Sequence, residues 1–231
     1  MRCLVTAGPT FEPMDAVRRL TNFSTGRLGT MLATFLAGRG HRVTLLRGEA
    51  SAYAITCADV RLQTFSTTED LGAKLAALAS EDVDAVFHAA AVSDFRFGRL
   101  WRRTPEGGLT EVRAAKIPTR DGALLAELVP TPKLLPQLRA WFPRAWLVGW
   151  KYEVEGDRAT ALALARQQLS ASRTDLSVVN GPAYGEGFGL VSPDAEPVHL
   201  PDARALFEAL AGRMEARSGT PRAAFGGGAV T

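Results

Sequence analysis

The sequence has few cysteines and no long apolar segment. Cys3 and Cys57 are the only two cysteines among 231 residues, and they do not form a Cys-x-x-Cys pair. This argues against a disulfide framework or a structural zinc site, and it is typical of proteins from a reducing compartment. No apolar run approaches the roughly 20 residues that span a bilayer, and the N-terminus lacks the pattern of a signal peptide. We therefore expect a cytoplasmic globular protein with no membrane partner.

A strong excess of charge of either sign is also absent. The net charge is +3, the isoelectric point is about 9.1, and 46% of the residues are hydrophobic. This small positive excess suits a protein that handles phosphorylated, acidic small molecules. The basic residues at 99–103 (Arg-Leu-Trp-Arg-Arg) form one short cluster, and such clusters more often solvate a loop than bind nucleic acid. We expect no nucleic-acid partner.

Short apolar runs alternate with helical patterns along most of the chain. The expected strands are Arg2–Thr6, His41–Leu46, Val60–Phe65, Asp84–Ala89, Ala145–Trp150 and Leu176–Val179. The expected helices are Gly26–Arg39, Thr68–Ser80, Thr131–Trp141, Asp157–Ser172 and Pro201–Ala216. This alternation predicts an α/β fold with a Rossmann-like, doubly wound parallel sheet. We assign residues 1–217 to a single nucleotide-binding domain and expect residues 218–231 to form a disordered tail, because few of them are apolar.

Three stretches interrupt this alternation. Gly8–Thr25 is far longer than the usual connection between a strand and its helix, which takes about 2–6 residues. Phe95–Leu128 is an excursion rich in arginine, glycine and proline, with a short strand expected near Leu109–Arg113. We interpret residues 96–120 as a flap that becomes ordered when ligands bind, because this segment has many arginines and few apolar anchors. Gly181–Leu200 has the pattern of a hairpin that turns at Pro193-Asp194.

Ligands of open parallel sheets bind outside the carboxyl ends of the strands. The residues expected at these ends include Gly8, Ala90, Ala91, Asp94, Trp150 and Asn180. The first turn lacks the Gly-x-Gly-x-x-Gly pattern of ordinary dinucleotide-binding sites. The next helix is preceded by Ser24 and Thr25, which can cap it, and its free N–H groups can bind a phosphate. A well-capped helix whose Gly26 permits close packing explains the same residues without a ligand.

Some of these polar residues have simpler interpretations. Asp94 can bind a ligand hydroxyl, but an aspartate at a turn commonly bonds to its own backbone. Lys116 lies in the second excursion, where a single lysine is most often solvated. Arg18 and Arg19 in the first long connection can also be surface charges.

Several short motifs follow one another between residues 3 and 214. They are Val5-Thr6-Ala7-Gly8-Pro9-Thr10, Glu12-Pro13, Asp15, Val17-Arg18, Asn22 to Gly29, Ala90 to Phe95, Lys116-Ile117, Thr131-Pro132, Val148-Gly149, Asp175-Leu176 with Asn180, and Gly187-Phe188. Each motif is weak alone, but in this order they resemble phosphopantothenoylcysteine synthetases. These enzymes of coenzyme A biosynthesis join 4′-phosphopantothenate to cysteine.

The sequence departs from that family at three places. The flap continues Lys116-Ile117-Pro118-Thr119, where the family usually has further lysines. Trp150-Lys151-Tyr152 replaces a run of smaller residues after Val148-Gly149, and Lys133 stands where many members have an aspartate. These departures bear on the triphosphate contacts and on the choice between CTP and ATP.

The resemblance implies a ligase reaction in two steps. The phosphopantothenate carboxylate is activated as an acyl nucleotide with CTP or ATP and Mg²⁺, and cysteine then takes the acyl group. The resemblance implies Asn22 and Lys116 as catalytic residues. It implies nucleotide contacts by Gly8, Ser24, Thr25, Gly26, Ala90, Ala91, Asp94 and Trp150. It implies substrate contacts by Arg18, Arg27 and Asn180, and it leaves the metal ligands unassigned. It further implies a homodimer. Related bifunctional proteins carry a flavin-dependent decarboxylase before this region. The present sequence begins with the synthetase region, so we expect it to bind no flavin.

Two other functions are compatible with parts of the sequence. One is a nicotinamide-dependent reductase, for which Arg47 at the end of the second strand could contact a 2′-phosphate. However, none of the three tyrosines is followed four residues later by the lysine of a Tyr-x-x-x-Lys motif. The other is a nucleotide-binding relative without turnover, which the altered flap and Lys151-Tyr152 would suit.

Overall fold

The computed structural model describes residues 1–119 and 122–218. Its largest element is an eight-stranded sheet with the order β13-β12-β11-β10-β6-β1-β4-β5. The bounds of the strands, in the same order, are Val198–Leu200, Phe188–Val191, Leu176–Asn180, Trp146–Tyr152, Ala85–Ala91, Arg2–Pro9, Arg42–Gly48 and Val60–Phe65. All pairs from β11 to β5 are parallel, and β12 and β13 add an antiparallel edge. The predicted sheet is therefore confirmed.

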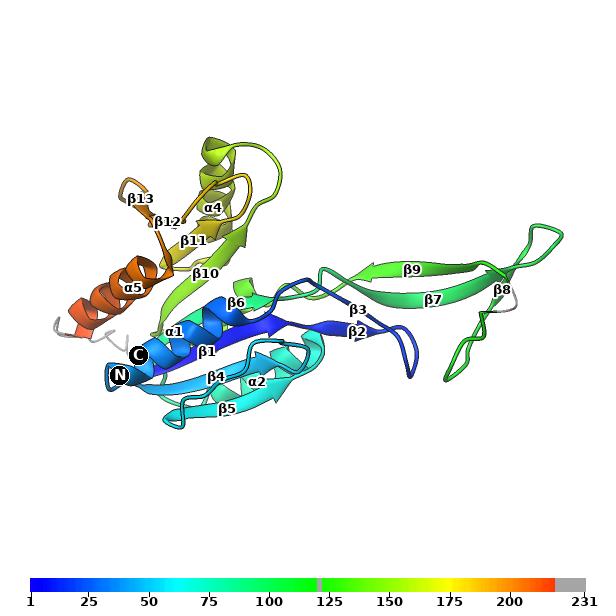
Figure 1. Ribbon diagram of the computed structural model, residues 1–231, viewed down its shortest axis with the longest axis horizontal. Helices are drawn as coiled ribbons and strands as arrows, with labels where there is room; N and C mark the ends of the chain where they lie inside the picture. Colours follow the sequence, from blue (N-terminus) through cyan, green and yellow to red (C-terminus); the bar gives the residue numbers. More distant parts are fainter. Residues whose placement is uncertain (120–121, 219–231) are drawn as a thin grey trace, which may run out of the picture.

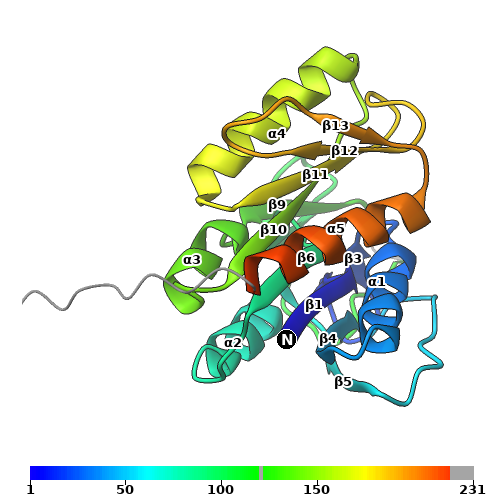
Figure 2. The ribbon, with the colours of Figure 1, turned by 90° about the vertical axis from the view of Figure 1, so that its left-hand side faces the viewer.

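Helices cover both faces of the sheet, as a doubly wound fold requires (Figure 2). Helices α1 (Arg27–Gly38) and α5 (Ala203–Ser218) lie on one face. Helices α2 (Thr68–Leu78), α3 (Leu138–Trp141) and α4 (Arg158–Ser172) lie on the other. In the described part of the chain, no helix is long and apolar enough to cross a membrane.

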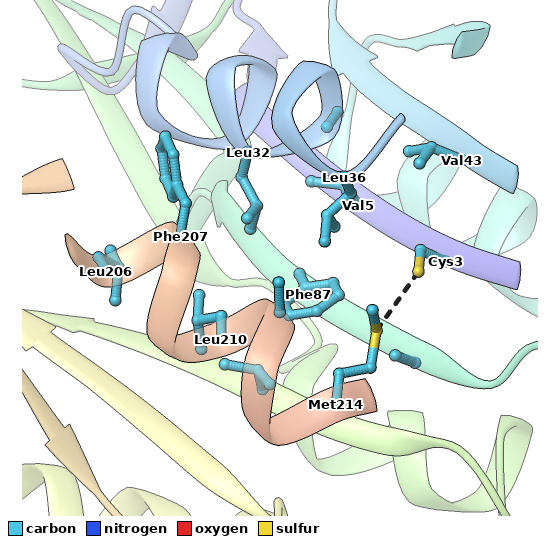
Figure 3. Packing of buried hydrophobic residues seen from close by; sticks show 14 of the residues in the cluster. Cys3, Val5, Leu32, Leu36, Val43, Phe87, Leu206, Phe207, Leu210 and Met214 are labelled. Atoms are coloured by element: carbon cyan, nitrogen blue, oxygen red, sulfur yellow. Dashed lines mark hydrogen bonds between the residues drawn. The ribbon is translucent and has the colours of Figure 1, made fainter. Parts of the chain in front are cut away.

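The core under α1 and α5 joins the beginning of the chain to its last described helix (Figure 3). Leu32 and Leu36 of α1 pack with Phe207 and Leu210 of α5 in one buried cluster over β1. At the bottom of this cluster the Cys3 thiol lies 3.5 Å from the Met214 sulfur, and burial raises the pKa of that thiol to about 12. Cys3 is therefore a core residue and not a reactive thiol.

Two antiparallel units project from the carboxyl ends of the strands (Figure 1). The first is the hairpin of β2 (Phe11–Pro13) and β3 (Arg19–Thr21), which forms most of the first long connection. The second is a sheet of order β8-β7-β9, with bounds Leu109–Glu111, Phe95–Arg103 and Leu124–Pro130. We call this second unit the arm, residues 95–130.

The sequence patterns missed several of these elements. The strand at 109–111 and the hairpin at 181–200 were predicted, but β2, β3, β7 and β9 were not. The helix predicted from Thr131 begins only at Leu135, as a 3₁₀ turn η1 (Leu135–Gln137) that leads into α3. The reason is local, because Pro132 disfavours a helical conformation at Thr131. The expected tail began at Ser218, which belongs to α5. The rest of that tail, residues 219–231, lies outside the described residues, and so do residues 120–121 of the flap.

Two helical glycines give opposite predictions for the same substitution. A Cβ on Gly29 of α1 would lie 2.7 Å from the Ala7 Cβ and 3.0 Å from the Thr6 carbonyl oxygen. A Cβ on Gly212 of α5 would meet nothing within 4 Å. We expect Gly212→Ala to stabilise the protein by about 0.5–1 kcal/mol, because alanine is the better helix former. Gly29→Ala should destabilise it by about 1–3 kcal/mol, because α1 must move off β1. Urea unfolding of both variants tests this, and equal shifts would contradict it.

Candidate functional site

A cavity of about 450 Å³ opens at the carboxyl ends of β6 and β10. The segment around η1 and one side of α4 complete its walls, and residues from these elements that matter below are His88, Ala90, Asp94, Lys133, Trp150 and Gln168. Another cavity, of about 470 Å³, lies on the arm beside Arg102, Arg103 and Arg113. We place the site in the first cavity, because the arm cavity is walled mostly by exposed side chains of one ribbon.

The mouth of the cavity carries a pair of opposite charges. Lys133 Nζ donates to the Asp94 carboxylate, and both side chains are about two-thirds exposed. The pair therefore contributes little to stability, since water screens it. A ligand with hydroxyl or phosphate groups can separate the two ends, so that each contacts the group of the ligand that suits it. Sequence reasoning noted Lys133 only as a departure from a family pattern and did not connect it with Asp94.

Buried hydroxyl groups fix the backbone that carries Asp94. The Ser93 amide donates to Thr10 Oγ1 over 2.8 Å, and the Thr10 hydroxyl donates to Ser93 Oγ over 3.0 Å. From the other side, the Thr131 hydroxyl donates to the Ser93 carbonyl, and the Thr131 amide donates to the Asp94 carbonyl over 2.9 Å. Thr10, Ser93 and Thr131 are all buried. The turn after β6 is thus held from two sides, which predefines the mouth of the cavity.

His88 lines the same cavity, with 6% of its surface exposed. Its Nδ1 is 2.9 Å from Thr6 Oγ1, the residue opposite it on β1. Thr6 Oγ1 also accepts from the Ala90 amide over 3.1 Å. The threonine has no other acceptor among the residues that the structure describes, so its proton is donated to Nδ1. The imidazole is then neutral, with its own proton on Nε2. Sequence reasoning missed this residue, although its place in the fourth strand was a signal.

Burial lowers the pKa of His88 to about 4, which predicts a dependence of stability on pH. In the unfolded chain the imidazole takes up a proton near pH 6.5, whereas in the folded chain it stays neutral down to about pH 4. Keeping His88 neutral therefore costs the folded state no free energy above pH 6.5. As the pH falls from 6.5 to 4, this cost grows and lowers the free energy of unfolding. Its size is about 3 kcal/mol at pH 4.

His88→Met removes this titration, so the difference in unfolding free energy between wild type and variant should change by about 3 kcal/mol between pH 7 and pH 4. Urea titrations at four pH values measure it, and the comparison cancels the contributions of all other groups. A difference that does not change with pH would show that His88 is not held neutral.

Trp150 at the end of β10 borders the cavity. Its carbonyl accepts from Gln168 Nε2 over 3.2 Å, and Gln168 Oε1 accepts from Ser177, so α4 is fastened to β10 and β11. Its indole packs against the cluster under α1 and α5, on the other face of the sheet, where Nε1 is buried and has no hydrogen-bond partner among the described residues.

The turn between β1 and α1 is already filled by the protein. Gly8 and Gly26 have φ values of +83° and +76°, and a Cβ on Gly8 would lie 1.8 Å from Ser51 Oγ. The predicted capping of α1 is wrong, because its N-cap is Gly26, which has no side chain. Ser24 and Thr25 precede it and accept only long bonds, of 3.4 and 3.3 Å, from the amides of Gly26 and Arg27. Close packing under Ser51 argues against a dinucleotide at this turn and hence against the reductase.

Asn22 is brought to the end of β6. Its Nδ2 donates to the Ala91 carbonyl over 3.1 Å, and the same carbonyl accepts from the Thr10 amide over 3.2 Å. The Asn22 side chain is exposed. The structure thus joins three predicted site residues, Asn22, Ala90 and Ala91, at one strand end, next to the turn that carries Asp94.

Lys116 lies at the turn between β2 and β3. The Asp15 carboxylate accepts from the Ile117 amide over 3.2 Å, Arg18 donates to the Ile117 carbonyl over 2.7 Å, and the Ala16 amide donates to the Ala115 carbonyl over 2.8 Å. Ile117 is 3% exposed, so this residue is a buried apolar anchor in a segment that was expected to have few of them. We call these contacts the bracket, residues 15–18 with 115–117.

Arg18 is the central cation of the bracket. Its Nε and Nη2 both donate to the same oxygen of the Asp15 carboxylate, over 3.0 and 2.5 Å, and the Arg18 guanidinium holds the pKa of that carboxyl well below its usual range. The structure therefore places Arg18 in contact with the protein itself, whereas its predicted role was substrate binding. Arg27 is exposed at the start of α1, and Asn180 lies at the end of β11, where its carbonyl accepts from the Glu153 amide. Neither lines the cavity.

Comparison with known proteins decides the family. The sequence profile of the DNA/pantothenate metabolism flavoprotein C-terminal domain matches residues 1–203. The chain belongs to this family. Among curated members, it is 33% identical over 180 residues to the coenzyme A biosynthesis bifunctional protein CoaBC of Thermococcus kodakarensis, an alignment that covers 78% of this chain and 41% of that protein. It is also 33% identical over 187 residues to CoaBC of Bacillus subtilis, an alignment that covers 80% of this chain and 42% of that protein. The chain thus spans less than half the length of these relatives.

Solved structures share the fold of this flavoprotein C-terminal domain. A DNA/pantothenate metabolism flavoprotein from Streptococcus pneumoniae superposes with a TM-score of 0.81 at 24% identity, covering 94% of this chain and 99% of that one. A mutant of Cab2 in complex with phosphopantothenate-cysteine superposes with a TM-score of 0.70 at 21% identity, covering 95% and 89%. At these identities the likeness shows the fold.

Proposed function

We propose that this chain is a phosphopantothenate–cysteine ligase that activates the carboxylate of 4′-phosphopantothenate with CTP or ATP. The observation that carries the proposal is the cavity at the strand ends, which in a chain of this family is walled by residues of the Ala90–Asp94 motif and by the buried His88. Figure 1 shows the arm and the β2–β3 hairpin leaving the sheet from the same strand ends.

The reaction sets two requirements for the protein. A phosphopantothenate carboxylate oxygen attacks the α-phosphorus, and the bond to pyrophosphate breaks. The cysteine amine then attacks the acyl carbon, the bond to the nucleotide breaks, and the amine loses a proton. The first step needs cations that reduce the repulsion between carboxylate and polyphosphate, which is the role of Lys116. The second step needs donors near the acyl oxygen, where negative charge develops.

The lining of the cavity offers different groups to different parts of a nucleotide. Leu134, Leu135 and Leu164 give it an apolar wall, which suits a base. Its mouth carries Asp94 and Lys133, which suit a ribose hydroxyl and a phosphate respectively. Ala90, Ala91 and Asn22 follow on the same strand end, where the acyl group is expected.

The described residues suit Mg²⁺ only as an ion that arrives with the triphosphate. No group of three or more His, Cys, Asp or Glu side chains in the described ranges could hold a metal ion. Mg²⁺ is commonly bound by one or two carboxylates together with substrate phosphates, and Asp94 is the carboxylate available at the mouth. Bound there, the ion would neutralise phosphate charge.

A second copy of the chain completes the proposed site. The bracket holds Lys116 at the tip of the β2–β3 hairpin, which projects away from the sheet. We infer a homodimer in which Lys116 of one copy serves the cavity of the other. Mixing Asp94→Ala with Lys116→Gln, each poorly active alone, should then restore up to about a quarter of the wild-type activity, because half of the dimers are mixed and each has one intact site. Without restoration, Lys116 and Asp94 serve the same copy.

The function is tested by release of pyrophosphate. With CTP or ATP, phosphopantothenate alone should give about one equivalent per site, and added cysteine should give continuous turnover. Nucleotide binding without any release of pyrophosphate would indicate a relative without turnover. Tight binding of NADPH, with none of CTP or ATP, would indicate the reductase.

A further inference from the structure

One buried polar group of the cavity is a histidine that the proposed reaction does not use. His88 lies on β6 between Thr6 of β1 and Gly149 of β10, in register with both. Only 6% of its surface is exposed, and it lines the cavity. A polar side chain that is 94% buried and open to a cavity on its remaining side is placed to contact whatever fills that cavity.

The tautomer of His88 decides what it can contact. Thr6 occupies Nδ1 as a donor, so the proton of the neutral ring is on Nε2. Nε2 has no hydrogen-bond partner among the described residues. Burial also keeps the ring neutral at physiological pH, because it lowers the pKa to about 4. His88 is therefore a neutral donor at all pH values at which the enzyme would work.

The walls of the cavity also include apolar side chains. Leu134, Leu135 and Leu164 line it together with His88. A heteroaromatic base fits, because cytosine (O2 and N3) and adenine (ring nitrogens) both present acceptors on their edges.

We propose that His88 determines specificity for the nucleobase by donating a hydrogen bond from Nε2 to an acceptor on the base edge. This rests on the proposed function, which places the base in the cavity. Thr6 acts as a positioning residue, because it holds the imidazole in the tautomer that donates. The base that binds best is the one whose edge offers an acceptor to His88 Nε2.

Two substitutions separate the donor from the shape of the side chain. His88→Met keeps an apolar side chain of similar length and removes the donor, whereas His88→Gln retains an N–H group near the position of Nε2. Calorimetry with CMP, AMP and pyrophosphate compares ligands with and without a base. We expect His88→Met to weaken binding of the preferred nucleotide by about three- to tenfold, and His88→Gln by less than about twofold. Pyrophosphate binding and the KM for cysteine should not change.

Each contrary result identifies what is wrong. If wild type binds a nucleotide and His88→Met binds it equally well, His88 has no role in base recognition, and the proposed function still stands. If pyrophosphate binding changes instead, His88 contacts phosphate. If wild type binds no nucleotide, the proposed function fails and this inference fails with it.

A measurement on the wild type covers the case in which a variant does not fold. Nitrogen-15 spectra of the histidine rings should show His88 protonated at Nε2 without ligand, and adding the preferred nucleotide should shift that signal. A proton on Nδ1, or an unchanged Nε2 signal at saturation, would overturn the proposal.

Discussion

Asn22→Asp is expected to form the acyl nucleotide normally and to transfer it to cysteine about 10²–10³ times more slowly than the wild type. The two steps differ in where negative charge develops. Activation occurs at the α-phosphorus, whereas transfer places an oxyanion on the acyl carbon. A neutral amide donor near that carbon aids only the second step.

The contacts of Asn22 explain why a nearly isosteric change should matter. Asn22 Nδ2 donates to the Ala91 carbonyl over 3.1 Å, and an amide nitrogen has a second proton to offer. In the aspartate variant an acceptor would face the Ala91 carbonyl, and a negative charge would lie beside the oxyanion. The side chain is thus both detached from the strand end and repelled by the transition state.

Quenched flow with labelled CTP measures both steps. The variant should release about one equivalent of pyrophosphate per site at the wild-type rate and then accumulate the intermediate. Gln63→Glu, on the far edge strand β5, makes the same change of net charge away from the cavity and serves as the control. Loss of the pyrophosphate burst, or full turnover, would refute the role assigned to Asn22.

Lys116→Gln is expected to have the complementary effect. Release of pyrophosphate should slow by about 10²–10³, because one charged donor to the phosphoryl groups is lost. Acyl nucleotide supplied from outside should still react with cysteine at nearly the wild-type rate. A defect confined to the cysteine step would refute the assignment.

The bracket gives this prediction a structural control. Asp15, whose side chain is fully buried, accepts from the Ile117 amide and pairs with Arg18, so Asp15→Asn should displace Lys116 without altering it. We expect a smaller loss of pyrophosphate release in Asp15→Asn than in Lys116→Gln, and almost no additional loss when both are combined. Additive losses would mean that the bracket acts on something other than Lys116.

The parts of the fold that sequence reasoning predicted are those with strong periodicity. The parallel strands and four of the helices follow from runs of apolar residues, because both faces of the sheet are buried. The arm gave no such signal. Its strand β7 reads Phe-Arg-Phe-Gly-Arg-Leu-Trp-Arg-Arg and is mostly exposed, so the two-residue period of a half-buried strand is absent.

The site shows the same limit. Motifs or strand ends pointed to Asn22, Ala90, Asp94 and Trp150, and the structure places all four at the carboxyl ends of the strands. The ion pair of Asp94 with Lys133 and the contact of Thr6 with His88 join residues 39 and 82 positions apart. Such contacts depend on which strands become neighbours, and no local pattern contains that information.

The N-terminus and the last described helix meet at the edge of the sheet opposite the cavity. The Met1 amino group lies 3.4 Å from His41, His41 contacts Glu215 of α5, and Arg39 pairs with the same carboxylate. The parallel strands begin at this edge and end at the cavity. A fluorescent label or affinity tag joined to Met1 would therefore sit on the side of the molecule away from the cavity, and it should report on folding without obstructing the cavity.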